Sequence, residues 1–223
     1  MSDGNMDRIA MADDILEYWM SLSRELASRF NIEEFDSSSA MWSWENFGED
    51  IKTLRNRLGV GNDHVNILGL RVNLFTGETM DLFTGDAFHT SRIIPHLYYY
   101  SRAKDKGIGN EWVKFGALRG SWACRYSFDE ENVNALTQAF VENREGLFKA
   151  LEKMGAKRVD FGEFAFELLF LPKVKILIVF EKDDEEFPAS VRLLYDSNSI
   201  FYLPHEQLGD ISWFLVSRAM KAL

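Results

Sequence analysis

The chain has 223 residues, 46% hydrophobic and 14% aromatic, and its 25 Lys and Arg against 35 Asp and Glu leave a net charge of −10. A chain of this length can bury about 70% of its unfolded surface without a metal or disulfide, and its aromatic content argues against an intrinsically disordered protein. The negative charge repels phosphate backbones and anionic lipids, so it argues against nucleic-acid binding and membrane-surface binding.

The sequence predicts a soluble, cytoplasmic protein. The longest apolar run, residues 174–180, is far shorter than the roughly 20 residues that cross a bilayer. The acidic start Met1-Ser2-Asp3-Gly4 lacks the basic and apolar regions of a signal peptide. Cys124 is the only cysteine, which excludes an intramolecular disulfide and an iron–sulfur cluster held by four thiolates of this chain.

The N-terminal part of the chain predicts two helices. Asp14 and Glu17 are spaced as in a capping box, and apolar residues then recur at helical spacing up to about residue 31. These residues are Ile15, Trp19, Leu22, Leu26 and Phe30. Residues 31–45 have no clear period and predict a connection. A second helix is expected over residues 46–58, ended by Gly59.

The next part of the chain predicts a β-meander and a helix. From Val65 to Leu74 apolar residues alternate with others, which predicts one half-buried strand. Thr76-Gly77 then turns the chain into a second strand. The sequence Leu-Phe-Thr-Gly-Glu at 74–78 recurs as Leu-Phe-Thr-Gly-Asp at 82–86, and two copies indicate a local meander rather than a repeat protein. Pro95 is expected to begin a helix over residues 96–103, with a loop over residues 104–110.

The C-terminal part predicts two helices around a group of strands. A long helix is expected from Asp129 to Gly155, because an apolar stripe follows one of its faces. The stripe is Val133, Leu136, Phe140, Leu147, Leu151 and Met154. Strands are expected over residues 164–170, 174–180 and 191–195. Their connections are too short for a crossover helix, so the strands should pair antiparallel. A last helix begins at Pro204.

This order of elements predicts an α+β fold rather than alternating βαβ units. An antiparallel β-meander and a hairpin would pack with N-terminal, central and C-terminal helices. No Pro-rich or Gly-rich linker divides the chain, so a single domain over residues 1–223 is expected, with residues 1–60 as a helical N-terminal lobe.

Three motifs lie near the C-terminus: Asp-Glu-Glu-Phe-Pro at 184–188, Leu-Tyr-Asp-Ser at 194–197 and Tyr-Leu-Pro-His-Glu at 202–206. Further segments are His-Leu-Tyr-Tyr-Tyr at 96–100, Glu-Trp-Val-Lys-Phe at 111–115, Gly-Glu-Phe-Ala-Phe at 162–166 and Leu-Pro at 171–172. Together they resemble the bacterial and archaeal domain of unknown function numbered 3786, over about residues 65–223. The resemblance implies no known activity.

Some members of that family carry an added four-cysteine cluster domain like that of corrinoid iron–sulfur methyl carriers. This chain, with Cys124 alone, has no such module. The resemblance therefore implies a link to anaerobic corrinoid or one-carbon metabolism only by association.

The candidate polar site consists of Asp184, Glu186, Asp196, His205 and Glu206. The acidic turn at 181–186 could bind Mg²⁺ or Ca²⁺ with Asp196 as a further oxygen ligand, although it lacks the spacing of an EF-hand loop. Alternatively, it is a solvated, self-repelling hairpin tip that keeps a sheet edge soluble. If it converges with His205 and Glu206, these two residues form the best acid–base pair in the chain.

Other catalytic signatures are incomplete. The histidines, His64, His89, His96 and His205, show no HxxxH or HExxH spacing that would indicate zinc. No GxSxG elbow or phosphate-binding GK[ST] motif occurs. A structural role is favoured for Cys124.

Aromatic residues offer a second candidate site. Tyr98, Trp112, Trp122 and Tyr126 could line a pocket for a flat or apolar ligand, with Arg119 and Arg125 at its rim. The alternative is that these rings pack in the core, where aromatics supply much of the buried area of any domain.

Two functional hypotheses follow. The first is a non-catalytic binding or accessory protein that acts on a protein partner or small ligand, because no complete catalytic constellation occurs. The second is an enzyme or cofactor-handling protein of corrinoid or one-carbon metabolism, using a divalent metal at the acidic C-terminal site. Convergence of the polar residues would support the second hypothesis. The sequence does not identify a cofactor, a partner or an oligomeric state.

Overall fold

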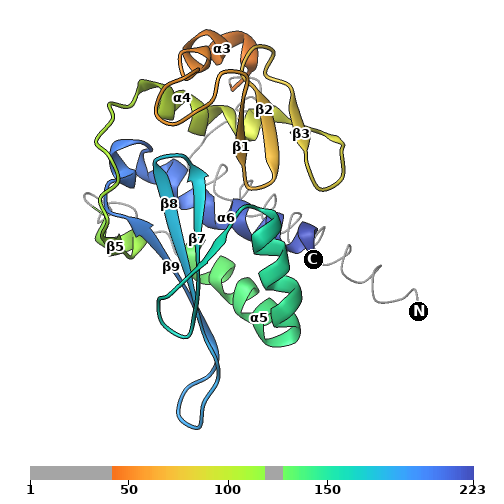
Figure 1. Ribbon diagram of the computed structural model, residues 1–223, viewed down its shortest axis with the longest axis vertical. Coiled ribbons are helices and arrows are strands. Elements are labelled where there is room, and N and C mark those ends of the chain that lie inside the picture. Colours follow the sequence, from red (N-terminus) through yellow and green to blue (C-terminus); the bar gives the residue numbers. More distant parts are fainter. Residues whose placement is uncertain (1–41, 119–127) are drawn as a thin grey trace, which may run out of the picture.

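The computed structural model describes residues 42–118 and 128–223. These residues form an α+β fold with two antiparallel sheets, as the sequence predicts (Figure 1). The helix expected over residues 14–31 lies outside the described residues. No helix in the described part of the chain is both long and apolar enough to span a bilayer.

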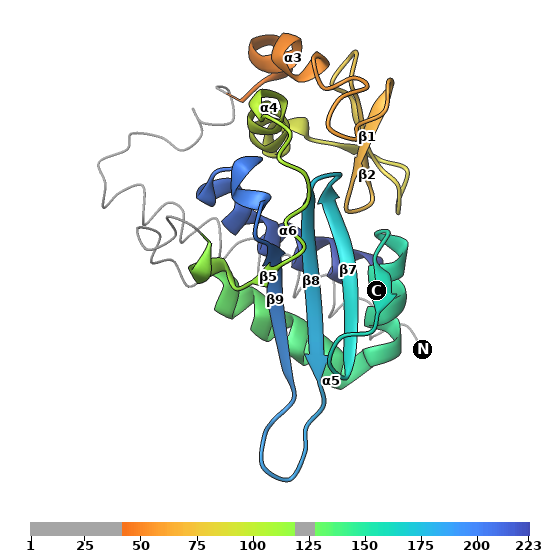
Figure 2. The same ribbon diagram turned by 60° about the vertical axis from the view of Figure 1, so that its left-hand side comes forward.

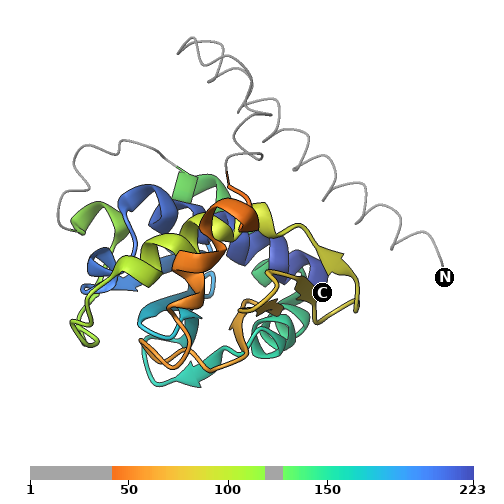
Figure 3. The same ribbon diagram turned by 90° about the horizontal axis from the view of Figure 1, so that it is seen from above.

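The first sheet lies beside two short helices. Its four strands follow the order β1-β2-β3-β4, with antiparallel neighbours, so the predicted meander is confirmed. The elements are α3 (Trp44–Lys52), β1 (His64–Ile67), β2 (Leu70–Asn73), β3 (Thr79–Asp81), β4 (Ala87–Phe88) and α4 (Ile94–Arg102). Seen from above, α3 lies across α4 (Figure 3).

The prediction of a single strand over residues 65–74 is wrong, because the chain forms a hairpin there. Leu68 and Gly69 have φ of 49° and 78°, the positive values that a two-residue hairpin turn requires. A Cβ at Gly69 would lie 2.3 Å from the ring of Phe83, so only glycine fits. The apolar alternation continues through the turn, and for that reason the period alone does not reveal it.

The second predicted helix is also misplaced. The helix α3 begins at Trp44, inside the expected connection, after Ser43 accepts a hydrogen bond from the amide of Asn46 at 3.4 Å. It ends at Lys52 rather than Leu58. Turns follow, in which Asn56 and Leu58 take positive φ of 58° and 49°, a backbone conformation that a helix excludes.

The second sheet has the strand order β5-β9-β8-β7-β6, and every neighbouring pair is antiparallel. Three of its strands confirm the predicted ones: β7 (Phe164–Leu171), β8 (Val174–Glu181) and β9 (Ser190–Asp196). The short edge strands β5 (Trp112–Val113) and β6 (Lys157–Val159) were not expected.

Two long helices, α5 (Phe128–Lys153) and α6 (His205–Ala222), cover one face of the second sheet (Figure 2). Alternate side chains of the strands point into this core, as the period of two predicts. They include Phe166, Leu168, Phe170, Ile176, Ile178, Phe180, Val191, Leu193 and Tyr195. The helix α5 is not regular, since Asn143 has non-helical φ and ψ of −150° and 63°.

Buried polar side chains join the first sheet and its helices to the second sheet. Tyr100 of α4 donates to the carbonyl oxygen of Leu58 at 2.7 Å and accepts from the amide of Lys173 at 3.1 Å. His96 of α4 bonds through Nε2 to the carbonyl oxygen of Gln207 in α6 at 3.1 Å. Because buried polar groups are costly when unpaired, these contacts fix how the two parts sit together.

Candidate functional site

The acidic hairpin that joins β8 to β9 projects beyond the rest of the molecule (Figure 1). Asp184 and Glu186 are both exposed in it. One carboxylate oxygen of Asp184 accepts from the amides of Glu186 at 2.8 Å and Phe187 at 2.7 Å. These two bonds lower the pKa of Asp184, because they favour the charged form. The carboxylate therefore holds the shape of its own turn.

Asp196 lies at the opposite end of β9. The strand runs from Ser190 to Asp196, so at about 3.3 Å per residue its ends are about 20 Å apart. The buried Asp196 carboxylate accepts from the amides of Gly109, Asn110 and Asn198, each at 2.9 Å. Its oxygens therefore already accept hydrogen bonds from backbone amides of the same chain.

The structure does not bring the five polar residues together. His205 begins α6, and its ring centroid lies 6.3 Å from that of Phe115. Glu206 follows it and is exposed. Asp184 and Glu186 lie at the far end of the hairpin. Across residues 42–118 and 128–223, no group of three or more His, Cys, Asp or Glu side chains could hold a metal ion.

The aromatic candidates lie in different places. Tyr98 contacts Phe47 and Trp42, with ring centroids 4.8 and 5.8 Å away. Trp112 lies on the face of the second sheet opposite the helices, with the ammonium of Lys175 at 5.3 Å from its ring. The other residues of this hypothesis lie outside the described residues: Trp122, Tyr126, Arg119 and Arg125, together with Cys124.

The motif residues near the C-terminus hold the loop at 104–110. The hydroxyl of Tyr202 accepts from the amide of Lys106 at 2.8 Å and donates to the carboxylate of Asp105 at 2.8 Å. The amide of Gly107 and then Tyr202 lower the pKa of Asp105. Asp196 is bonded to the same loop. Tyr202 and Asp196, both residues of the motifs, therefore fix the connection between the two sheets. They do not by themselves indicate a reaction.

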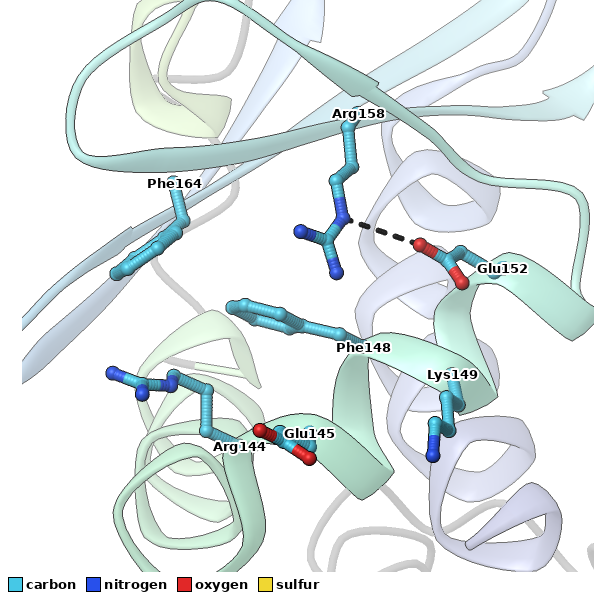
Figure 4. A pocket seen from close by; sticks show the side chains of 7 residues that line it. All are labelled: Arg144, Glu145, Phe148, Lys149, Glu152, Arg158 and Phe164. Carbon is cyan, nitrogen blue, oxygen red and sulfur yellow. Dashed lines mark hydrogen bonds and ion pairs between the residues drawn. The ribbon is translucent and has the colours of Figure 1, made fainter.

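A pocket of about 310 Å³ opens between α5 and the β6–β7 hairpin (Figure 4). This volume is at the lower end of the range for small-molecule sites, roughly 300–1,000 Å³. The lining residues are Arg144, Glu145, Phe148, Lys149, Glu152, Arg158 and Phe164. Positive side chains therefore outnumber negative ones here, although the whole chain is acidic.

Two phenylalanine rings form the apolar wall of the pocket. Phe148 is 4% exposed, and its ring centroid lies 5.5 Å from that of Phe164 and 4.8 Å from that of Phe166. Phe140 and Phe180 pack on the same group, with centroids 6.0 and 5.3 Å from that of Phe148. Because the wall is the edge of a packed cluster, it is a fixed surface.

Three cations stand around these rings. The Nε of Arg158 lies 3.2 Å from Glu152, and its guanidinium is 5.2 Å from the ring centroid of Phe148. The terminal nitrogens of Arg158 point into the pocket (Figure 4). The guanidinium of Arg144 and the ammonium of Lys182 lie 5.4 and 4.9 Å from the ring centroid of Phe164. Each contact is within the distance at which a cation and a ring attract.

The kink in α5 positions one side of the pocket. The side-chain oxygen of Asn143 accepts from the amide of Gly146 at 3.1 Å, which is how an N-cap begins a helix. The second half of α5 therefore starts at Arg144, and Arg144, Phe148 and Glu152 follow at intervals of four residues along one face. The first turn of this half-helix adds a partial positive charge near Arg144.

Sequence reasoning missed this pocket. Arg158 lies on the short strand β6, which has no apolar period, and the Asn143 kink interrupts a stripe that otherwise reads as one straight helix. The excess of positive charge at 144–149 and 158 was the signal available, but only the fold brings the two segments together.

The comparisons with known proteins place the chain in a family. Residues 69–218 match the model of a family described as a domain of unknown function, DUF3786. The chain belongs to this family. The match confirms the resemblance drawn from the motifs, and it includes every residue that lines the pocket. No curated protein and no solved structure matches the chain. Membership in DUF3786 therefore brings no known activity with it.

Proposed function

We propose that this DUF3786 protein is a non-catalytic binding protein, and that the pocket between α5 and the β6–β7 hairpin holds a small anionic molecule with a flat or apolar body. The observation that supports this function is the placement of Arg144 and Arg158 around the rings of Phe148 and Phe164. An apolar wall with a few converging polar groups is the usual form of a ligand site.

The charges of the pocket favour a carboxylate or a similar anion. The Nε of Arg158 is occupied by Glu152, which leaves the terminal nitrogens for a second partner. Those nitrogens can bind a carboxylate at two points. The flat body of the ligand would then lie against the half-buried ring of Phe164, since aromatic rings stack in offset or edge-to-face geometry.

The pocket lining supports binding rather than catalysis. It contains no histidine, cysteine or serine, and its carboxylates belong to Glu145 and Glu152. Glu152 pairs with Arg158, so it is held as a counter-ion. A nucleophile and a base within hydrogen-bonding reach of each other are the usual requirement for covalent catalysis, and the lining does not provide them.

The test uses benzoate as the probe, because it carries one carboxylate on a flat ring. We expect benzoate to bind with a Kd on the order of 1 mM, since few atoms make contact. Replacing both arginines, Arg144→Gln with Arg158→Gln, should weaken binding about tenfold or more, the effect of losing charged hydrogen bonds. NMR chemical-shift titration of the full chain measures both values.

Two controls make the test specific. Arg55 lies over the ring of Phe75 at 4.6 Å, outside the pocket, so Arg55→Gln should leave benzoate binding unchanged. Benzyl alcohol, which has the ring without the charge, should bind more weakly than benzoate. Equal binding of benzoate to the double variant, or shifts outside the pocket, would disprove the proposed function.

A further inference from the structure

The acidic hairpin, residues 182–189, carries an aromatic ring at its tip. Phe187 is 66% exposed there. Asp183, Glu185 and Glu186 are exposed beside it, and their carboxylates form no ion pair within the described residues. The tip therefore combines a flat apolar group with free negative charge, which is the chemistry that the pocket between α5 and the β6–β7 hairpin is expected to bind.

The hairpin is held in one direction, beyond the end of the second sheet. At its base Lys182 pairs with Glu163, and Glu181 pairs with Arg192. Asp184 fixes the turn by accepting from two amides of the tip. At roughly 3.3 Å per residue, the four residues after Glu181 carry the tip about 13 Å past the strands. Both side views show it projecting from the molecule (Figures 1 and 2), so it is placed to meet another molecule.

The pocket offers a surface of opposite charge. Arg144 and Lys149 form no ion pair within the described residues, and the terminal nitrogens of Arg158 point into the pocket (Figure 4). The half-buried ring of Phe164 lies among these cations. An apolar cavity of about 150 Å³ is known to accept benzene, so a pocket of about 310 Å³ has room for one phenyl ring. Hairpin and pocket are therefore complementary in charge and compatible in size.

The pocket and the hairpin lie at the same end of the second sheet. Phe164, which lines the pocket, is the cross-strand partner of Phe180, and the hairpin begins two positions after Phe180. A two-fold axis beside this end would place the hairpin of each copy on the pocket of the other, so that both contacts form at once. Such an exchange is closed, whereas a one-way contact would keep adding copies.

We propose that the acidic hairpin of a second copy of this chain occupies the pocket, in a reciprocal dimer. Phe187 packs against Phe164, and the free carboxylates beside it pair with Arg144 and Arg158. The inference rests on the proposed function, since the hairpin presents the chemistry of the small ligand to the same site. It adds a means of regulation, because the dimer closes the pocket and the ligand must compete with the partner.

Sedimentation velocity of the full chain tests the dimer. We expect a dissociation constant on the order of 100 µM, because the contact is small. Phe187→Ala should raise this constant at least about tenfold, since a ring buried in a pocket typically dominates such a contact. The matched control is Phe201→Ala, which removes a 44% exposed ring beyond the opposite end of β9. A parent protein that stays monomeric at about 1 mM, or an equal effect of the two variants, would overturn the inference.

Mixing two variants tests which surfaces meet. Phe187→Ala keeps the pocket, while Arg144→Gln with Arg158→Gln keeps the hairpin, so neither variant alone has a complete contact. The mixture regains one of the two contacts. We therefore expect the two variants to associate with each other at least about tenfold more tightly than either associates with itself. A mixture that is as monomeric as its components would disprove the contact between hairpin and pocket.

Benzoate separates this inference from the proposed function. At about 10 µM protein most pockets are free, whereas at about 500 µM only about a quarter are free if the dimer dissociates at about 100 µM. The apparent affinity of the parent protein for benzoate should therefore fall about fourfold at the higher concentration. Phe187→Ala should show no such change.

The outcomes of the benzoate titrations are distinct. Binding by the parent protein that is equal at both concentrations would keep the proposed function and overturn the dimer. Tighter binding by Phe187→Ala than by the parent at every concentration would place the hairpin of the same molecule in the pocket, and this too overturns the inference. If benzoate does not bind Phe187→Ala at all, the proposed function fails, and the competition fails with it.

Discussion

Arg218 of α6 and Asp81 of β3 form a two-point ion pair inside the protein. Their paired nitrogen and oxygen atoms are 2.6 and 2.7 Å apart, and the two side chains are 3% and 1% exposed. Arg218 also donates to the carbonyl oxygens of Leu68 and Gly69, at 3.0 and 3.3 Å. The arginine lowers the pKa of Asp81. This pair therefore ties the C-terminal helix to the first hairpin.

The ion pair predicts a large effect for Asp81→Asn. The variant leaves Arg218 buried without its counter-ion, which typically costs about 3–5 kcal/mol of folding free energy. Asparagine keeps the local turn, because Asn73 occupies the same position in the first copy of the repeated sequence. Asn73 accepts from the amide of Phe75 at 2.8 Å, as Asp81 accepts from the amide of Phe83 at 2.9 Å. Urea unfolding at pH 7 measures the loss.

The reciprocal variant is the control. Asn73→Asp introduces a carboxylate into the equivalent turn, which is near the surface, so we expect a change within about 0.5 kcal/mol. If Asp81→Asn were as mild as Asn73→Asp, the ion pair would contribute little to holding α6 on the first sheet.

Because His96 is buried, we expect the protein to lose stability in mild acid. The ring is buried between Phe170 and Phe214, with centroids 5.1 and 5.4 Å away, and burial lowers its pKa to about 4. Its Nε2 carries the proton, because the carbonyl oxygen of Gln207 can only accept. An unfolded histidine titrates near pH 6.5. The folded protein therefore takes up the proton at a lower pH than the unfolded chain does. Its stability falls as the pH is lowered from about 6.5 to about 4.

The size of this effect is on the order of 3 kcal/mol, at 1.36 kcal/mol per pKa unit. His96→Phe should remove it, so its stability should depend less on pH than that of the parent protein over this range. Desolvation and the charge of Glu206 raise the pKa of Asp210. A raised carboxyl pKa increases the stability of the folded protein as the pH falls, so it opposes the effect of His96. Because Asp210 is exposed to solvent, this opposing effect is weakened. The comparison cancels this contribution, because both proteins retain Asp210.

The measurement is the urea midpoint at pH 7 and at pH 4.5 for both proteins. The control is His64→Phe, which replaces an exposed histidine of β1 and retains His96, so the loss of stability that His96 causes between pH 7 and pH 4.5 should persist. Parallel curves for the parent protein and His96→Phe would mean that His96 does not carry the acid sensitivity.

The packing of the loop at 104–110 predicts that replacing Gly109 by alanine destabilises the protein. A Cβ there would lie 2.4 Å from the hydroxyl of Ser197 and 3.1 Å from a carboxylate oxygen of Asp196. Gly109→Ala must therefore displace the loop from the Asp196 carboxylate, and the loss of buried hydrogen bonds should cost roughly 1–3 kcal/mol. The control is Gly116→Ala, where no atom of the described residues, apart from Gly116 itself and its two chain neighbours, lies within 4 Å of the added carbon. Thermal melting compares the two, and equal melting temperatures would argue against a fixed loop.

Strong local patterns were predictable from the sequence. The strands β7, β8 and β9 follow long apolar runs, and α6 begins after Pro204, as expected. The turn at Leu68–Gly69 was missed because the alternation of apolar residues crosses it unchanged. The strand β6 was missed because three exposed residues carry no period, and pairing with β7 stabilises it.

Long-range polar contacts were out of reach for the same physical reason. Asp81 and Arg218 are 137 positions apart, and neither residue differs in local pattern from a solvated charge. The pocket likewise depends on Arg158 meeting α5 after the kink at Asn143. The polar residues that the motifs singled out were visible in the sequence, but their positions at opposite ends of β9 follow only from the register of the sheet.

We expect the stability of the protein to change little when the exposed charges of the acidic hairpin are neutralised. Asp184→Asn with Glu186→Gln removes two exposed charges, while the side-chain oxygen of asparagine can still accept from the amides of Glu186 and Phe187. If the tip is only solvated, the free energy of unfolding should change by less than about 0.5 kcal/mol. If the turn instead binds Mg²⁺ or Ca²⁺, adding the ion should raise the melting temperature of the parent protein and not that of the variant, because a ligand that binds only the folded state stabilises it. Melting curves with and without each ion, after treatment with a chelator, decide between these two outcomes.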